Sequence, residues 1–168
     1  MYEDMGKTRH AITFRSTVLK NTKSVYVKMK SNLSLAQYYR FAGKKRKARQ
    51  YFDAFKEICE KNYGSIEEWL SLYGTRRIRF FDIGQYYYAD GNLEGLEMCV
   101  NGMENAPICD MCECCNCFEL YILKGHLNTL KGNIEEAVKN YEIAKHGCGN
   151  PSDNFIDGYI EMAKKKKR

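Results

Sequence analysis

Proline is scarce in this chain, and long apolar runs are missing. Only Pro107 and Pro151 occur among 168 residues, so long stretches run without a backbone breaker. A sandwich of short strands needs frequent turns, and the scarcity of proline therefore favours helices. No run is long enough to cross a bilayer, and the first ten residues lack the apolar core of a signal peptide. We therefore expect a cytoplasmic protein whose thiols are kept reduced.

Recognisable catalytic motifs are missing as well. The three histidines are His10, His126 and His146, and none lies in a metalloprotease or nucleophile-elbow pattern. The stretch GCGNP, at residues 147–151, lacks the third glycine and the preceding strand that a phosphate-cradling loop needs. We therefore predict that the protein is not an enzyme.

Charge is divided unevenly along the chain, although the net charge is only +6. Residues 1–50 hold 13 Lys and Arg against 2 Asp and Glu, whereas residues 51–150 hold 9 against 16. A basic end joined to an acidic body can bind an anionic partner or attract its own other half. The densest basic cluster contains Lys44, Lys45, Arg46, Lys47 and Arg49. It would contact phosphate or an acidic protein surface, or serve only as a solvated helix face.

Three glycines occupy the same place in three similar segments. Gly43, Gly91 and Gly132 each end an apolar helical stretch, and an amphipathic stretch begins a few residues later. Glycine readily adopts the left-handed backbone that often follows a helix. Asn133 is expected to cap the helix after Gly132, with Glu136 as its reciprocal partner. The pattern predicts three helical pairs.

These pairs resemble the tetratricopeptide repeat, a helix–turn–helix family with a period of about 34 residues. The third pair matches best, with Phe118, Tyr121, Gly125, Gly132, Ala137, Tyr141 and Ala144 in order. The family places small residues at Gly125 and Ala137 because the two helices cross there closely. The first pair fills the corresponding places with Ala36, Gly43, Ala48, Phe52 and Phe55. The second keeps Gly84 and Gly91 but carries Leu96, Val100 and Met103.

The resemblance covers residues 29–168, with departures in spacing. The pairs begin near Met29, Arg77 and Phe118, which is further apart than the family's period. Ser65 to Glu68 has the form of a capping box, so part of the surplus is expected to be an extra helical turn or two. A final helix with Phe155, Tyr159 and Met162 on one face is expected to cap the array. Residues 1–28 form a basic segment, and residues 10–30 are expected to be mostly helical and packed on the first pair.

The family usually holds peptides on its concave surface, and the resemblance implies such a surface here. The residues expected to face it are Gln37, Arg40, Phe81, Gln85, Tyr88, Ile122, His126 and Thr129. Phe81 and Tyr88 would supply aromatic contact, or would only pack helix against helix. The predicted function is a non-enzymatic module that binds another protein or peptide. The alternatives are a regulatory protein that contacts nucleic acid through its basic N-terminal half, and a zinc- or redox-responsive regulator.

Five of the eight cysteines lie within CDMCECCNC, at residues 109–117. Antiparallel pairs place the connections between pairs on one edge of an array. A tetrahedral zinc site at that edge would use Cys109, Cys112, His146 and Cys148. An alternative set is Cys112, Cys114, Cys115 and Cys117. Reduced cysteines also pack as small apolar side chains, and the acidic neighbours Asp110 and Glu113 oppose a redox switch. No other cofactor is predicted.

Overall fold

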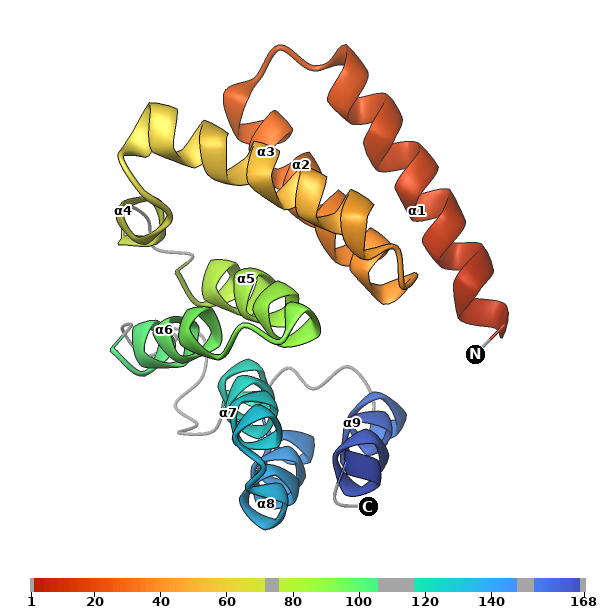
Figure 1. Cartoon of the computed structure of the whole chain (residues 1–168), viewed down its shortest axis with the longest axis vertical. Coiled ribbons are helices and arrows are strands. Elements are labelled where there is room, and N and C mark those ends of the chain that lie inside the picture. Colours follow the sequence, from red (N-terminus) through yellow and green to blue (C-terminus); the bar gives the residue numbers. More distant parts are fainter. Residues whose placement is uncertain (1, 72–75, 106–116, 148–152, 167–168) are drawn as a thin grey trace. The chain divides into compact units, whose positions relative to one another are not determined.

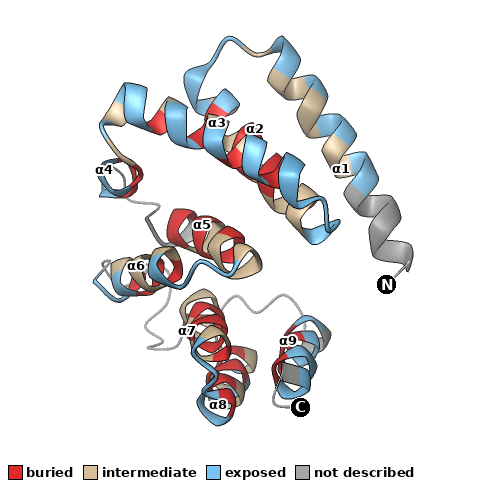
Figure 2. Ribbon diagram, in the orientation of Figure 1, coloured by how far each residue is buried: buried red, intermediate tan, exposed pale blue. Residues whose placement is uncertain are grey.

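The computed structural model describes residues 2–71, 76–105, 117–147 and 153–166. Within these ranges every regular element is an α-helix (Figure 1), which confirms the all-α prediction. The chain divides into two compact units, Met1–Gly74 and Thr75–Arg168. Each unit is built from neighbouring antiparallel helices with a buried side and an exposed side (Figure 2).

The first unit contains four helices, α1 (Tyr2–Asn21), α2 (Val25–Phe41), α3 (Lys45–Tyr63) and α4 (Ile66–Ser71). Helices α2 and α3 form the first predicted pair, α1 packs on α2, and α4 packs on α3. Residues 10–30 are mostly helical, as expected, with a break before α2. The hydroxyl of Ser24 accepts a hydrogen bond from the Val27 amide there, which starts α2 four residues before Met29.

The core of the first unit is apolar and aromatic. Phe55 and Trp69 are buried and meet edge to face, with their ring centroids 5.5 Å apart. Met29 and Cys59 are also fully buried, and their sulfur atoms lie 3.3 Å apart. Ser65 begins α4 as predicted, since its hydroxyl accepts a hydrogen bond from the Glu68 amide at 2.9 Å. The helix that this cap begins places Trp69 against Phe55 of α3, so the surplus residues extend the core.

The second unit contains five helices, α5 (Arg76–Asp90), α6 (Leu93–Glu104), α7 (Phe118–Lys131), α8 (Ile134–Lys145) and α9 (Asp153–Lys166). Helices α5 and α6 form one predicted pair, and α7 and α8 form the other. Helix α7 also packs on α5 and α6, and α9 packs mainly on α8. The second unit is therefore two pairs and a final helix.

Glycine makes both the turns and the close crossings, as the sequence predicts. Gly43, Gly91 and Gly132 follow the first helix of each pair with φ angles of 73°, 74° and 80°. A Cβ atom on Gly84 would lie 2.7 Å from a methyl carbon of Leu123, across the contact between α5 and α7. A Cβ atom on Gly125 would lie 2.3 Å from the Tyr141 ring. The helices can approach this closely only because both positions lack a side chain.

Two local predictions are wrong. Asn133 occupies the N-cap position of α8, but its side chain accepts no capping hydrogen bond. Its side-chain amide instead lies 3.5 Å from Oδ1 of Asn128, and the backbone at Asn133 has a ψ of 68°. Asn92, at the equivalent position before α6, does cap its helix, since its Oδ1 accepts a hydrogen bond from the Gly95 amide at 2.9 Å.

The buried face of α9 also differs from the expected one. Its inward residues are Ile156, Tyr159, Ile160 and Ala163. Phe155 and Met162 are 46% and 52% exposed, so only Tyr159 of the predicted trio is buried. These four residues form a continuous apolar stripe at i, i+3, i+4 and i+7, and this stripe packs against α8. The helix is therefore rotated about its axis relative to the predicted orientation.

Candidate functional site: an aromatic–polar cluster in the second unit

Polar and aromatic side chains from four helices meet inside the second unit. We call them the aromatic–polar cluster, and it consists of Gln85 and Tyr88 from α5, His126 and Thr129 from α7, Tyr141 from α8 and Tyr159 from α9. His126 is fully buried at its centre. A buried polar group is costly unless it forms hydrogen bonds, so each partner of His126 matters.

The imidazole of His126 has a partner at each nitrogen. Nδ1 lies 2.8 Å from the Tyr141 hydroxyl, and Nε2 lies 3.3 Å from Oε1 of Gln85. A neutral ring that donates from Nε2 and accepts at Nδ1 satisfies both contacts. The Tyr159 hydroxyl donates to the same Gln85 oxygen at 3.3 Å. These bonds join α5, α7 and α8 through His126, and they join α9 to the same network through Gln85.

Aromatic rings enclose the imidazole as well. The Tyr88 ring stacks on it, with centroids 3.7 Å apart and planes 1° from parallel. The Tyr159 ring meets it edge to face at 4.5 Å, and the Tyr141 ring does so at 5.7 Å. Such ring pairs add about 0.5–1.5 kcal/mol beyond the area that they bury. The cluster is therefore a tightly defined packing centre.

Burial keeps the phenols of the cluster un-ionised. Loss of solvent raises the pKa of both Tyr141 and Tyr159 well above the usual value for tyrosine. The same cause raises the pKa of Tyr88, and its hydrogen bond to Tyr141 opposes that rise. These tyrosines therefore stay neutral hydrogen-bonding groups at an alkaline pH at which an exposed phenol begins to ionise.

The structure brings the second-unit residues of the predicted concave surface together, but it does not leave them open. Gln85, Ile122, His126 and Thr129 are buried. The expected open groove is wrong at these positions, because Tyr88 covers His126 from one side and Tyr159 of α9 covers it from another. Phe81 and Tyr88 are half-buried. The counting of helical positions found the convergent residues but missed Tyr141 and Tyr159, which belong to α8 and α9.

Three partly buried rings and one exposed ring, Phe155, lie at the edge of the buried cluster, and one of them, Tyr88, also belongs to it. We call Phe81, Tyr88, Phe118 and Phe155 the aromatic rim. Phe81 and Phe118 pack at 6.0 Å between centroids, and both lie against the core of the second unit. Phe155 leans on Tyr159 at 4.9 Å, and Tyr159 lies 6.5 Å from Tyr88. The rim offers apolar ring surface that is held in place by the cluster beneath it.

Gln37 and Arg40 belong to the first unit. Both are half-exposed residues of α2. Their predicted alignment with the residues of α5 and α7 stays a prediction, because the two units are described separately.

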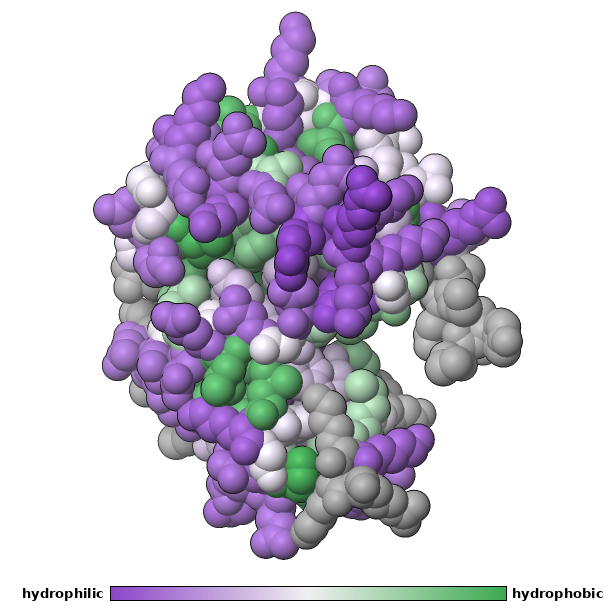
Figure 3. Space-filling model, viewed as in Figure 1, coloured by the Kyte–Doolittle hydropathy of each residue, from purple (hydrophilic) through white to green (hydrophobic). Residues whose placement is uncertain are grey.

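The predicted basic cluster lies at the turn between α2 and α3. Lys44, Lys45, Arg46, Lys47 and Arg49 are all exposed. Hydrophilic side chains dominate the visible surface over α3 (Figure 3). The ammonium group of Lys47 lies 5.4 Å from the centroid of the Tyr39 ring. The cluster is thus a solvated surface with an aromatic neighbour.

Most of the predicted zinc ligands lie outside the described residues. These are Cys109, Cys112 and Cys148, along with Cys114 and Cys115 of the alternative set. His146 is exposed at the end of α8, and Cys117 is buried at the start of α7. The parts of the chain that the structure describes contain no group of three or more potential metal ligands. Zinc binding stays a prediction, which native mass spectrometry before and after chelation tests.

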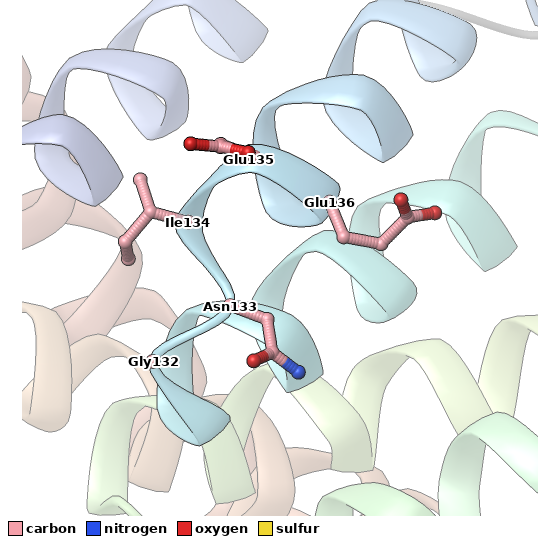
Figure 4. Close-up of a pocket in the computed structure, with 5 residues that line it drawn as sticks. All are labelled: Gly132, Asn133, Ile134, Glu135 and Glu136. Carbon is pink, nitrogen blue, oxygen red and sulfur yellow. The ribbon is translucent and has the colours of Figure 1, made fainter.

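A pocket of about 430 Å³ lies at the turn between α7 and α8. Its lining runs from Gly132 to Glu136 (Figure 4), and the side chains of Glu135 and Glu136 point apart. Carboxylates at the first turn of a helix stabilise its positive end. They serve the helix here and do not converge on a ligand.

Comparison with known proteins returns no relative: no family model, curated protein or solved structure matches the chain. Among the described helices, none combines the length and apolar character needed to span a bilayer.

Proposed function

We propose that the protein is a non-enzymatic interaction module that binds a segment of another protein on the aromatic rim of the second unit. One observation carries the proposal: Phe155 is 46% exposed, yet its ring is held against the buried Tyr159. An exposed apolar ring with a fixed position loses little freedom on binding. Aromatic side chains of this kind contribute much of the affinity at protein interfaces.

The buried cluster gives the rim its rigidity. Tyr88 stacks on His126, whose nitrogens contact Gln85 and Tyr141. A ring fixed in this way presents one preorganised surface. The partner is expected to cover the rim from outside instead of entering an open groove, because the interior is already filled. Membership of the tetratricopeptide repeat family and a cytoplasmic location remain predictions of the same proposal.

Site-specific photocrosslinking in the native cell tests this function. A photoreactive amino acid at Phe155 should capture a defined protein. The same group at Lys164 should not, because Lys164 is exposed half a helical turn around α9 from Phe155. Equal capture of the same proteins from both positions would contradict the proposal.

Purified components then give the energetics. With the captured partner, Phe155→Ala and Tyr88→Ala should each weaken binding by roughly tenfold, the loss of one interface anchor. Lys164→Ala should leave the affinity unchanged. Added salt should have little effect, since rim contacts are apolar.

A further inference from the structure

A surface in the first unit has chemistry unrelated to the aromatic rim. Residues 1–74 hold 15 Lys and Arg against 7 Asp and Glu, a net charge of +8, whereas residues 75–168 hold 12 against 14, a net charge of −2. The excess is densest at the start of α3. We call Lys44, Lys45, Arg46, Lys47 and Arg49 the basic end of α3. Within the described ranges, no ion pair joins Lys44, Lys45, Arg46 or Lys47 to a carboxylate.

The positive charges at the basic end destabilise the start of α3. The first turn of α3 has no acidic residue, and Lys44 at its N-cap position forms no side-chain cap. Cations at this end meet the positive pole of the helix and one another, and both effects are unfavourable. By contrast, α4, α6, α7 and α8 carry glutamate in their first turn, while α2 and α5 lack an acidic residue there, as α3 does. A local rule broken without a structural gain marks a functional surface.

Aromatic rings adjoin these cations. Phe41, three residues before Lys44, is 62% exposed. Tyr39 and Tyr51 stack in parallel, with centroids 5.4 Å apart and planes 6° from parallel. Lys47 lies over the Tyr39 ring. The turn therefore combines a run of cations with one open ring and one supported pair of rings.

We propose that the basic end of α3, together with Phe41, binds single-stranded nucleic acid. The cations and the free amides of the first helical turn contact phosphates, which satisfy the positive helix end. A base stacks on the exposed face of Phe41, which a duplex cannot offer because its bases are paired and stacked. An acidic protein segment would also meet the cations, but it would leave the open ring without a planar partner. This site is independent of the function proposed for the second unit.

Fluorescence anisotropy with a labelled oligonucleotide of about twelve nucleotides tests the site on the full chain. With four or five phosphate contacts, a rise from about 50 to 200 mM salt should weaken binding roughly 50- to 130-fold. RNA and DNA single strands of one sequence are measured side by side. Tighter binding of either single strand than of the matching duplex supports the site. Equal binding of the matching duplex, or equal competition by polyglutamate at the same charge concentration, would overturn it.

Matched variants locate the site. Lys45→Gln with Arg46→Gln should flatten the logarithmic salt dependence by about 1.4, the value for two lost contacts to a single strand. Lys56→Gln with Lys61→Gln removes the same charge from the C-terminal half of α3 and should leave the slope intact. Phe41→Leu should weaken binding roughly fivefold or more at an unchanged slope. Identical effects of the two charge pairs would show that net charge alone is responsible, which contradicts the proposal.

Discussion

The two units share the helical pair but differ in the side chains that they bury and expose. In the first unit the buried contacts are mainly apolar, as in that of Phe55 with Trp69, and a dense cationic end lies outside. In the second unit the largely apolar core also encloses a polar centre, where His126 contacts Gln85 and Tyr141, and the Phe155 ring lies exposed outside it. The first unit thus presents dense positive charge beside the exposed Phe41 ring, and the second presents the Phe155 ring, which packs on a buried hydrogen-bonded cluster.

The contrast teaches that a shared hairpin leaves the chemistry of each surface free to vary. Gly43 and Gly132 make equivalent left-handed turns in the two units. The helices after these two turns begin differently, since cations open α3, whereas Glu135 and Glu136 open α8. The backbone geometry is the same, and the side chains of the second helix decide whether the turn attracts or repels anions.

The largest expected effect is a loss of stability confined to the first unit. Phe55→Ala should lower its free energy of unfolding by about 3–5 kcal/mol, because a fully buried ring leaves a cavity beside Trp69. Trp69 is the sole tryptophan, so its fluorescence during urea unfolding reports this unit. Phe155→Ala, at a half-exposed ring, is the control and should shift the Trp69 transition little. Equal losses would contradict the distinction between the two cores.

Alkaline pH should act mainly on the second unit. Burial raises the pKa of Tyr141 and Tyr159, so above about pH 10 the unfolded chain loses protons that the folded unit retains. The unfolded state is then favoured, and stability falls as pH rises, by at most about 1.4 kcal/mol per tyrosine and pH unit. Between pH 9 and 11 the loss should reach roughly 2–3 kcal/mol.

Urea unfolding at the two pH values measures this loss. Circular dichroism should show a weakened transition, while the fluorescence of Trp69 should shift less. Tyr141→Phe and Tyr159→Phe should each reduce the pH dependence. A pH dependence that both variants leave untouched would rule out the cluster as its source.

Glycine substitution sharpens the comparison within the second unit. Gly125→Ala places a Cβ atom 2.3 Å from the Tyr141 ring, which its neighbours hold fixed, and should cost about 1–3 kcal/mol. Gly158→Ala makes the same change on the exposed side of α9, where no atom lies within 4 Å. Gly158→Ala should raise the free energy of unfolding by about 0.5–1 kcal/mol, because alanine favours the helix more than glycine does. Thermal melting of both variants checks the opposite signs.

A smaller difference is expected between two helix starts. Asn92→Ala removes the side-chain oxygen that accepts from the Gly95 amide and should cost about 1 kcal/mol. Asn133→Ala should cost only a few tenths of a kcal/mol, roughly the effect of an N-cap residue that makes no such bond. A chemical denaturation series resolves the pair, and equal costs would contradict the capping geometry.

The smallest expected effect concerns the basic end of α3. Lys45→Glu should raise stability by about 0.3–1 kcal/mol, because it places a carboxylate at the positive pole of the helix. The same change should weaken oligonucleotide binding. Lys56→Glu, in the middle of the helix beside Glu60, should give no such gain. A loss of stability in Lys45→Glu would show that the cations support the fold.

Local features of the fold could be predicted from the sequence. The three turns needed only glycine after an apolar helix, and the start of α4 needed only Ser65 and Glu68, because partners within four residues are fixed by the backbone. Asn133 shows the boundary of this reasoning. It has the right type and spacing, but its side-chain amide lies against Asn128 and it makes no capping hydrogen bond.

The closed state of the candidate site could not be predicted in the same way. The sequence placed Gln85 and His126 on one face through helical counting, and they do meet. Whether that face is open depends on where Tyr159 arrives from α9, and α9 carries two apolar stripes that share this residue. Tertiary packing chose the stripe with Ile156 and Ile160. The chosen stripe is the more continuous one, with Ile160 and Ala163 extending it, and this continuity is the signal within α9 that the prediction missed.

Hydrogen–deuterium exchange of the full chain, with and without single-stranded oligonucleotide, tests the division of roles between the two units most directly. The account predicts added protection confined to the end of α2 and the start of α3, with unchanged exchange in α5, α7 and α9. Protection that instead appears in the helices around His126, with none near Lys45, would contradict it.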